Sequence, residues 1–182
     1  MKKLFIACTL FFTTALSSAN AGMFDLKAKT TTSDFDGKTM VTMQPTGLTC
    51  KQWTFICPML GYAWFKDLPN EMVLRVQVLD MAKKDYYQIK NFRMNIDGEI
   101  IQFPFFGDGV TSFDHDGVSM TTSTNSFKAP FDLTKKVNDA KSVKIQIVTN
   151  NGIFEDTMKG SDKQTKADKY LQVFLDEVAK NK

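Results

Sequence analysis

The feature that most constrains the fold is a β-hairpin that the sequence predicts over Tyr86–Phe106, with its turn at Asp97-Gly98. Both central residues of a type I′ turn need a positive φ, which Asp and Gly tolerate better than most residues. The turn fixes a register with one mainly apolar face, formed by the pairs Ile96–Glu99, Met94–Ile101 and Phe92–Phe103. The other face is mostly polar near the turn, with the pairs Asn95–Ile100 and Arg93–Gln102. An antiparallel sheet over a single core requires this division, so we expect the hairpin at the centre of the sheet.

Residues 1–21 have the organisation of a signal peptide. Lys2 and Lys3 form a basic start, Leu4 to Phe12 an apolar region, and Ala19-Asn20-Ala21 a cleavage site of the A-x-A type. The apolar run is too short for a transmembrane helix, and no later run approaches ~20 apolar residues. We therefore expect a periplasmic or secreted protein that is cleaved before Gly22 and has no transmembrane segment in its mature chain.

The mature chain, residues 22–182, has a length that suits a single domain. Its formal charge is close to neutral, because the whole chain carries +3 and two lysines leave with the signal peptide. There is no basic stripe and no acidic tail, so we do not expect nucleic acid as a partner.

The three cysteines bear on the compartment of the protein. Cys8 lies within the predicted signal peptide, and Phe5-Ile6-Ala7 before it makes a poor lipobox, so we do not expect a lipoprotein. Cys50 and Cys57 then form an even pair, which predicts a disulfide in an oxidising compartment. A helix would hold their Cα atoms about 10 Å apart and a strand more than about 20 Å, whereas a disulfide needs about 4.4–6.8 Å. The chain must therefore fold back between them, as a structural crosslink and not as a C-x-x-C redox motif.

Alternation of apolar and polar residues predicts further strands around the hairpin. Met72–Leu79 alternates most regularly, with Leu74, Val76 and Val78 on one face. Other strands are expected at 38–44, 143–147 and 153–158, with a first strand or loosely held arm over 24–33. A second, edge-like hairpin is predicted around Asp116-Gly117, with the pairs Phe113–Met120 and Thr111–Thr122.

Two helices are predicted near the C-terminal end. The short one, near 131–140, would begin with Asp132 as its cap and bury Leu133, Val137 and Ala140. The longer one, near 162–180, would begin with the capping box Ser161-Asp-Lys-Gln164. It has an apolar stripe that consists of Ala167, Tyr170, Leu171, Phe174, Leu175 and Val178. Such a stripe must pack on apolar surface, so we expect an α+β fold, an antiparallel sheet or sandwich with the C-terminal helix packed on it.

The sequence offers little for catalysis. Its single histidine, His115, lies beside the predicted Asp116-Gly117 turn, and strand alternation places Ser112 on the opposite face, so we interpret it as a polar residue at a hairpin tip. Asp108, Asp114 and Asp116 lack the regular ligand spacing of a calcium loop. Motifs for zinc, nucleotides and nucleophilic hydrolysis are missing as well. We predict no catalytic residues, no metal site and no cofactor.

The sharpest functional signal is a group of aromatic residues near Cys50 and Cys57. It includes both tryptophans of the chain and consists of Trp53, Phe55, Tyr62, Trp64 and Phe65. Aromatic side chains held in place by a disulfide would form a preorganised contact surface. The alternative is that they seal one end of the core, as large aromatic residues usually do. Phe103-Pro104-Phe105-Phe106 is a second candidate, with at least one exposed ring.

Export, a structural crosslink, near-neutral charge and the missing catalytic motifs predict a non-catalytic binding or envelope-associated protein. Its partner would be an envelope protein or a small ligand. Two alternatives stay open. An envelope hydrolase that uses acidic residues, with His115, would need a cleft in which two carboxyl groups converge. A carrier of a small apolar ligand would need a cavity beneath Tyr170 and Phe174.

Overall fold

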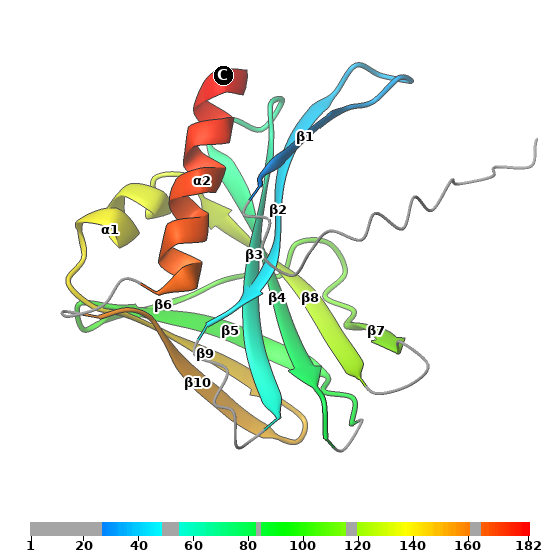
Figure 1. Cartoon of the computed structure of the whole chain (residues 1–182), viewed down its shortest axis with the longest axis vertical. Coiled ribbons are helices and arrows are strands. Elements are labelled where there is room, and N and C mark those ends of the chain that lie inside the picture. The colour runs from blue at the N-terminus through cyan, green and yellow to red at the C-terminus, as the bar shows by residue number, and fades with distance from the viewer. Residues whose placement is uncertain (1–26, 49–54, 83–84, 116–119, 161–164) are drawn as a thin grey trace, which may run out of the picture.

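The computed structural model describes residues 27–48, 55–82, 85–115, 120–160 and 165–182, which form two antiparallel sheets and two helices (Figure 1). The larger sheet has the order β1 (Lys29–Thr32), β2 (Thr39–Gly47), β3 (Ile56–Phe65), β4 (Glu71–Asp80), β8 (Thr121–Pro130) and β7 (Ser112–His115). The smaller sheet has the order β10 (Gly152–Lys159), β9 (Val143–Thr149), β5 (Ile89–Ile96) and β6 (Glu99–Gln102). The helices are α1 (Leu133–Asp139) and α2 (Lys166–Asn181). The predicted α+β class is confirmed.

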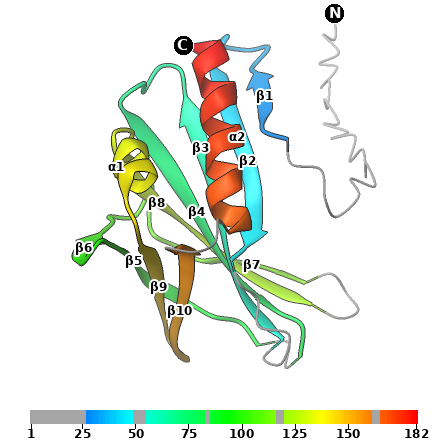
Figure 2. The same ribbon diagram turned by 60° about the vertical axis from the view of Figure 1, so that its left-hand side comes forward.

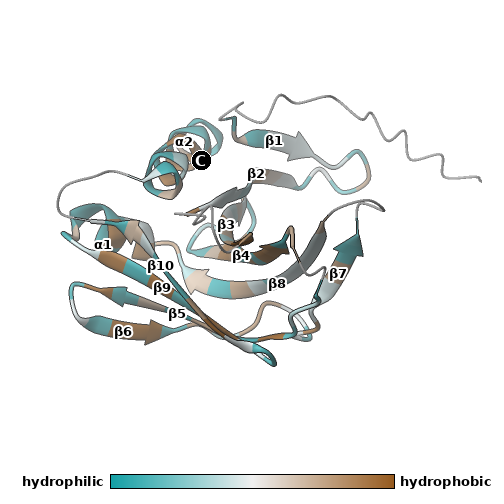
Figure 3. Ribbon diagram, turned by 60° about the horizontal axis from the view of Figure 1, so that its bottom comes forward, coloured by the Kyte–Doolittle hydropathy of each residue, from teal (hydrophilic) through white to brown (hydrophobic). Residues whose placement is uncertain are grey.

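The two sheets and α2 enclose one hydrophobic core. Figures 2 and 3 show the smaller sheet lying across the larger one, with α2 at the open side between them. The helix contacts β2 and β3 of the larger sheet and β10 of the smaller one. The largest fully buried side chains come from all three layers and include Trp64, Phe92, Phe127 and Phe174. In the part of the chain that the structure describes, neither helix combines the length and the apolar composition needed to cross a bilayer.

The hairpin of β5 and β6 has the register that its turn predicts. Met94 pairs with Ile101 and Arg93 with Gln102. Asp97 has a φ of 50° and Gly98 a φ of 97°, as a type I′ turn requires. Its placement at the centre of the sheet is wrong, however. β6 is a four-residue edge strand of the smaller sheet, and the central strands of the larger sheet are β3 and β4.

Residues 103–106 carry the chain from one sheet to the other. The Phe103 N–H donates to the Phe92 carbonyl on β5 at 3.2 Å, and the Phe106 N–H donates to the Ser126 carbonyl on β8 at 2.9 Å. The two sheets are therefore joined along one side, between β5 and β8, which leaves the opposite side open for α2.

Asn125 of β8 secures this joint from inside the core, where it is 3 % exposed. Its Nδ2 lies 3.3 Å from the Ile89 carbonyl on β5 and 2.9 Å from the Gly109 carbonyl. A buried amide is stable only when it is hydrogen-bonded, so Asn125 specifies how the two sheets meet.

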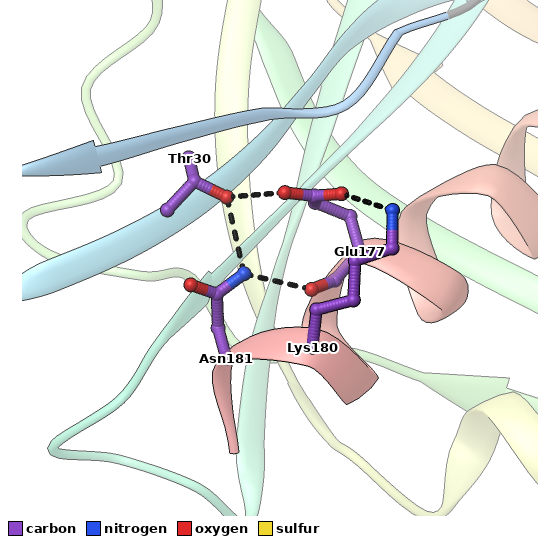
Figure 4. A network of polar contacts seen from close by, with 4 residues as sticks. All are labelled: Thr30, Glu177, Lys180 and Asn181. Atoms are coloured by element: carbon purple, nitrogen blue, oxygen red, sulfur yellow. Dashed lines mark hydrogen bonds and ion pairs between the residues drawn. The ribbon is translucent and has the colours of Figure 1, made fainter.

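α2 is fixed at its C-terminal end by contacts with the first strand. Figure 4 shows the network: Thr30 of β1 donates to the Glu177 carboxylate at 2.7 Å, Lys180 donates to the same carboxylate at 2.9 Å, and Asn181 reaches the Thr30 hydroxyl at 3.1 Å. The hydrogen bond from Lys180, followed by that from Thr30, holds the pKa of Glu177 below its ordinary value. The short first strand thus has a partner in the helix besides its neighbour β2.

Both predicted helix starts need correction. Asp132 occupies the N-cap position of α1, but it has helical φ and ψ values of −68° and −15° and its side chain makes no capping hydrogen bond. The N-cap of α2 is Thr165, whose hydroxyl accepts the Asp168 N–H at 3.3 Å, so the helix begins at Lys166. The predicted capping box, residues 161–164, lies outside the described residues. Thr165 and Asp168 have the Thr-x-x-acid spacing that is typical of a helix start, and this signal was missed.

The second hairpin also has a register different from the predicted one. Phe113 of β7 pairs with Ser123, and His115 pairs with Thr121. The predicted pairing of Phe113 with Met120 is therefore wrong, because the connection between the strands is longer than two residues. The turn itself, residues 116–119, lies outside the described residues. β7 is an exposed edge strand, as expected.

A bulge in β2 creates a position that only glycine fills. The β2–β3 register shifts between Met43 and Thr46, because Pro45 interrupts the pairing. Gly61 lies opposite the bulge, and a Cβ atom there would lie 2.7 Å from the Pro45 nitrogen and 2.8 Å from the Met43 carbonyl oxygen. Both neighbours are backbone atoms, which cannot move aside without distorting the strand.

We expect Gly61→Ala to lower the free energy of unfolding by about 2 kcal/mol or more, since the added methyl group overlaps with backbone. Chemical denaturation measures the change. Gly160→Ala is the matched control, because a Cβ at Gly160 would have its nearest neighbour, Thr157, at 3.9 Å. Equal stability of the two variants would contradict the assigned role of Gly61.

Two buried tyrosines make the stability sensitive to alkaline pH. Burial raises the pKa of Tyr62, and the charge of Asp168 adds to this effect. Burial also raises the pKa of Tyr87, together with the hydrogen bond that its hydroxyl donates to Asp80 at 2.8 Å. Both phenols therefore stay protonated in the folded state at pH values where the unfolded chain already ionises.

We expect the free energy of unfolding to fall as the pH rises above about 10, the ordinary tyrosine pKa, because the unfolded state then binds fewer protons than the folded state. Each such tyrosine contributes a loss of up to about 1.4 kcal/mol per pH unit. Tyr62→Phe should reduce this slope, and denaturation curves between pH 9 and about pH 12 test it. An unchanged slope in the variant would exclude Tyr62 as a source of the alkaline loss.

Candidate contact surface

The outer face of the larger sheet carries a groove of about 560 Å³. Its floor is formed where β2, β3, β4 and β8 run side by side, by Thr42, Ala63, Val73 and Thr124. Thr42 pairs with Ala63 and Ala63 with Val73, so these three share one face, and Thr124 lies on the same face because it is four residues from Lys128, the partner of Val73. Among the described residues, no helix packs on this face, since α2 covers the opposite one (Figure 3).

A pair of aromatic rings forms one end of the groove. Phe65, at the end of β3, stacks on Phe106, with ring centroids 6.2 Å apart and planes at 14°. Val73 on β4 is only 7 % exposed and helps to line the small space between the two rings. Phe106 itself is 40 % exposed, so the pair offers apolar surface to solvent.

Arg75 lies in the middle of the groove. Its neighbours across the sheet are Gly61 on β3 and Ser126 on β8, both of which are small. The side chain is exposed, and its guanidinium makes no hydrogen bond or ion pair with the part of the chain that the structure describes. An arginine on a sheet face between small neighbours has its donors available for a ligand.

The charge of the groove has one sign. Lys29 and Arg75 are among the lining residues, whereas none of the lining residues is an aspartate or a glutamate. The remaining polar groups are mainly hydroxyls and amides, including Ser112, Thr124 and Ser126. The arrangement suits an anionic group that lies next to an apolar one.

The five aromatic residues singled out in the sequence do not form one surface. Tyr62 is 2 % exposed and Trp64 is not exposed at all, so both belong to the core and cannot take part in an exposed contact. Phe65 points to the other face of β3, into the groove. Phe55 is 53 % exposed at the opposite end of the same strand. For Tyr62 and Trp64 the core alternative was therefore the right one, and Trp53 lies outside the described residues.

Only one of the two cysteines of the predicted disulfide belongs to the described residues. Cys57 is buried in β3 with 3 % exposure, and Cys50 lies outside the described residues. The crosslink therefore stays a prediction.

The second aromatic candidate contributes to the groove. In the segment 103–106, Phe103 is buried and packs on Phe92, while Phe105 and Phe106 are 38 % and 40 % exposed. The prediction of at least one exposed ring is thus confirmed.

Arg75 and Ser126 were not identified as site residues, because nothing in their local sequence distinguishes them from other outward-facing strand residues. The alternation of Met72–Leu79 does place Arg75 on the face opposite Leu74 and Val76.

Several acidic residues of the described chain are engaged by other groups. Glu71 pairs with Lys128 at 2.6 Å and Glu99 lies beside Lys136. The buried Asp80 accepts hydrogen bonds from the Ala82 N–H and the Tyr87 hydroxyl. His115 is exposed on β7 and lies in the same row of the larger sheet as Asp80, because each of them pairs with Thr121 of β8. No group of three or more metal-ligating side chains occurs within the described residues.

The interior beside α2 is densely packed. A space lined by Tyr62, Met158, Leu171 and neighbouring core residues has a volume of about 10 Å³, about that of one water probe. Phe174 is fully buried against Tyr62, with ring centroids 5.5 Å apart. A small apolar ligand would find no room at this place.

Comparison of the chain with protein-family models, with curated proteins and with solved structures finds no match.

Proposed function

We propose that this chain is an exported, non-catalytic binding protein, and that its contact surface is the groove on the outer face of the larger sheet. The observation that carries the proposal is one groove that combines the Phe65–Phe106 pair with Arg75, an arginine that has no partner among the described residues. Aromatic and arginine side chains contribute most to binding energy at protein interfaces. The groove lies on rigid strands, so little ordering cost accompanies binding.

The partner that fits this groove is a segment of an envelope protein that presents a carboxylate next to an apolar side chain. Arg75 can bind a carboxylate through two parallel hydrogen bonds, and Lys29 adds positive charge nearby. The apolar side chain would pack on the exposed edge of the Phe65–Phe106 pair. Catalysis by acidic residues finds no support in the described carboxylates, and a buried ligand finds none in the packing beside α2.

A photoreactive amino acid at Ser126 tests the proposal in cells. We expect crosslinked products from this position, identified by mass spectrometry, whose yield falls at least about fivefold when Phe106→Ala or Arg75→Glu is introduced, since each removes a main contact. The same photoreactive residue at the exposed Lys135 of α1 serves as the control and should give none of these products.

Both substitutions are at exposed positions, and we expect them to change the free energy of unfolding by less than about 1 kcal/mol. A Ser126 position that yields no product, or products that persist in both variants, would contradict the contact surface.

Export itself rests on the signal peptide, and the disulfide is part of the same proposal. In a bacterial host we expect the protein in the periplasmic fraction, with Gly22 as its first residue, because signal peptidase cleaves after small residues such as Ala19 and Ala21. Under denaturing conditions the thiols of Cys50 and Cys57 should react with maleimide only after reduction, while Cys50→Ser should react without it. Cytoplasmic protein that begins at Met1, or free thiols in the wild type, would contradict this part.

A further inference from the structure

The outer face of the smaller sheet carries a second groove, of about 530 Å³. A row of side chains crosses it on three neighbouring strands, because Arg93 of β5 pairs with Gln146 of β9, and Gln146 pairs with Glu155 of β10. The next row contains Lys144, which pairs with Asn95. This face is far more polar than the groove on the larger sheet, and it has not entered the proposed function.

Arg93 has a donor that lacks a partner. Its Nε atom is buried and has no hydrogen-bond acceptor, and no ion pair of its guanidinium is found among the described residues. An unsatisfied buried donor costs about 1–3 kcal/mol, and more when it belongs to a charged group. Because Arg93 lies on an inner strand of the smaller sheet and this cost is not offset within the described residues, we infer that the acceptor belongs to a bound ligand.

The nearest carboxylate in the same row is already engaged. Glu155 accepts a hydrogen bond from the Gln146 amide, which lies between it and Arg93. Glu155 thus lies two strand spacings from Arg93, about 9–10 Å between their backbones. Lys144 is a diagonal neighbour of Arg93 on the next strand, close enough for both cations to reach one anionic group.

The groove therefore has a positive side and a negative side. Arg93 and Lys144 form the positive side, and Glu155 forms the negative side. A simple anion would be repelled by the carboxylate, and a simple cation by Arg93 and Lys144. A molecule that carries both charges close together matches the two sides.

We propose that this groove binds a small zwitterion of the α-amino acid type. The carboxylate of the ligand accepts hydrogen bonds from Arg93 and Lys144, and its ammonium group lies toward Glu155, over Gln146. The buried Nε–H of Arg93 then has its acceptor. The groove has room for such a ligand, and the long side chains of Arg93 and Glu155 reach it from both sides.

Three matched probes test the proposal with the whole mature protein: L-alanine, propionate, which lacks the ammonium group, and ethylamine, which lacks the carboxylate. In ¹⁵N–¹H correlation spectra we expect L-alanine to shift the backbone amides of β5 and β9 in a saturable way. Propionate and ethylamine should bind at least about tenfold more weakly, because each satisfies only one side of the groove.

Variants assign the two sides. Arg93→Gln should abolish the shifts caused by L-alanine, and Glu155→Gln should weaken L-alanine about tenfold without weakening propionate. Arg93→Lys, which keeps the charge but has no Nε–H, provides a second test should Arg93→Gln fail to fold. Arg75→Gln on the other sheet is the control and should leave L-alanine binding unchanged, which separates this site from the contact surface proposed above.

Three outcomes would overturn the proposal: no saturable shift with L-alanine, equal affinity for L-alanine and propionate, or L-alanine binding that survives both Arg93 variants. Failure of the crosslinking experiment on the larger sheet has no bearing on this site, since the two grooves lie on different sheets.

Discussion

The packing of α2 into the open side between the two sheets is the contact on which the rest of the structure depends. Ala167, Leu171, Phe174 and Val178 are each at most 2 % exposed, and full burial of a large apolar side chain contributes about 1.5–3 kcal/mol. Without the helix, the inner faces of β2 and β10 would be exposed along one whole side of the molecule. The apolar stripe of α2 thus completes a core that neither sheet can close alone, and the network around Glu177 holds the end of the helix against β1.

Because the helix fills this place, the two larger grooves described above lie on the outside of the sheets. The interior beside α2 has space of about 10 Å³, whereas the outer faces of the two sheets carry grooves of about 560 and 530 Å³. The two grooves differ in chemistry because the outward-facing residues of the strands differ. On the larger sheet they are apolar or hydroxyl-bearing around Arg75, and on the smaller sheet they are charged or amides around Arg93. The two proposed sites therefore call for ligands of different chemistry.

Local chemistry explains which elements the sequence predicts well. The Asp97-Gly98 turn defines a two-residue connection, so the register of β5 and β6 follows from it, and the stripe of α2 follows from helical spacing. Only the first part of β8 is predicted, as the second strand of the hairpin around Asp116-Gly117. Its length escapes prediction because its buried side chains include Ser123, Thr124 and Asn125, which are residue types typical of loops. They are buried only because partners distant in sequence satisfy them: Asn125 bonds Ile89 and Gly109, and the Ser123 hydroxyl accepts the Tyr87 N–H at 2.8 Å. The groove on the larger sheet also combines residues of several strands, so no local sequence pattern predicts it.

The aromatic residues near Cys57 do not form one contact surface, because the length of strand β3 separates them. Phe55 and Phe65 lie ten positions apart on or beside β3, so an extended strand separates them by roughly 33 Å. Phe55 has a φ of 52°, unusual for a bulky residue, and its carbonyl accepts the Met81 N–H at 2.8 Å, which holds it at the far end of the larger sheet. A compact partner segment cannot cover both ends of such a strand. Of the two rings, only Phe65 lies in one groove with a cationic group and a second ring, and this juxtaposition favours the β3–β4–β8 face over the loop end as the proposed place for a partner.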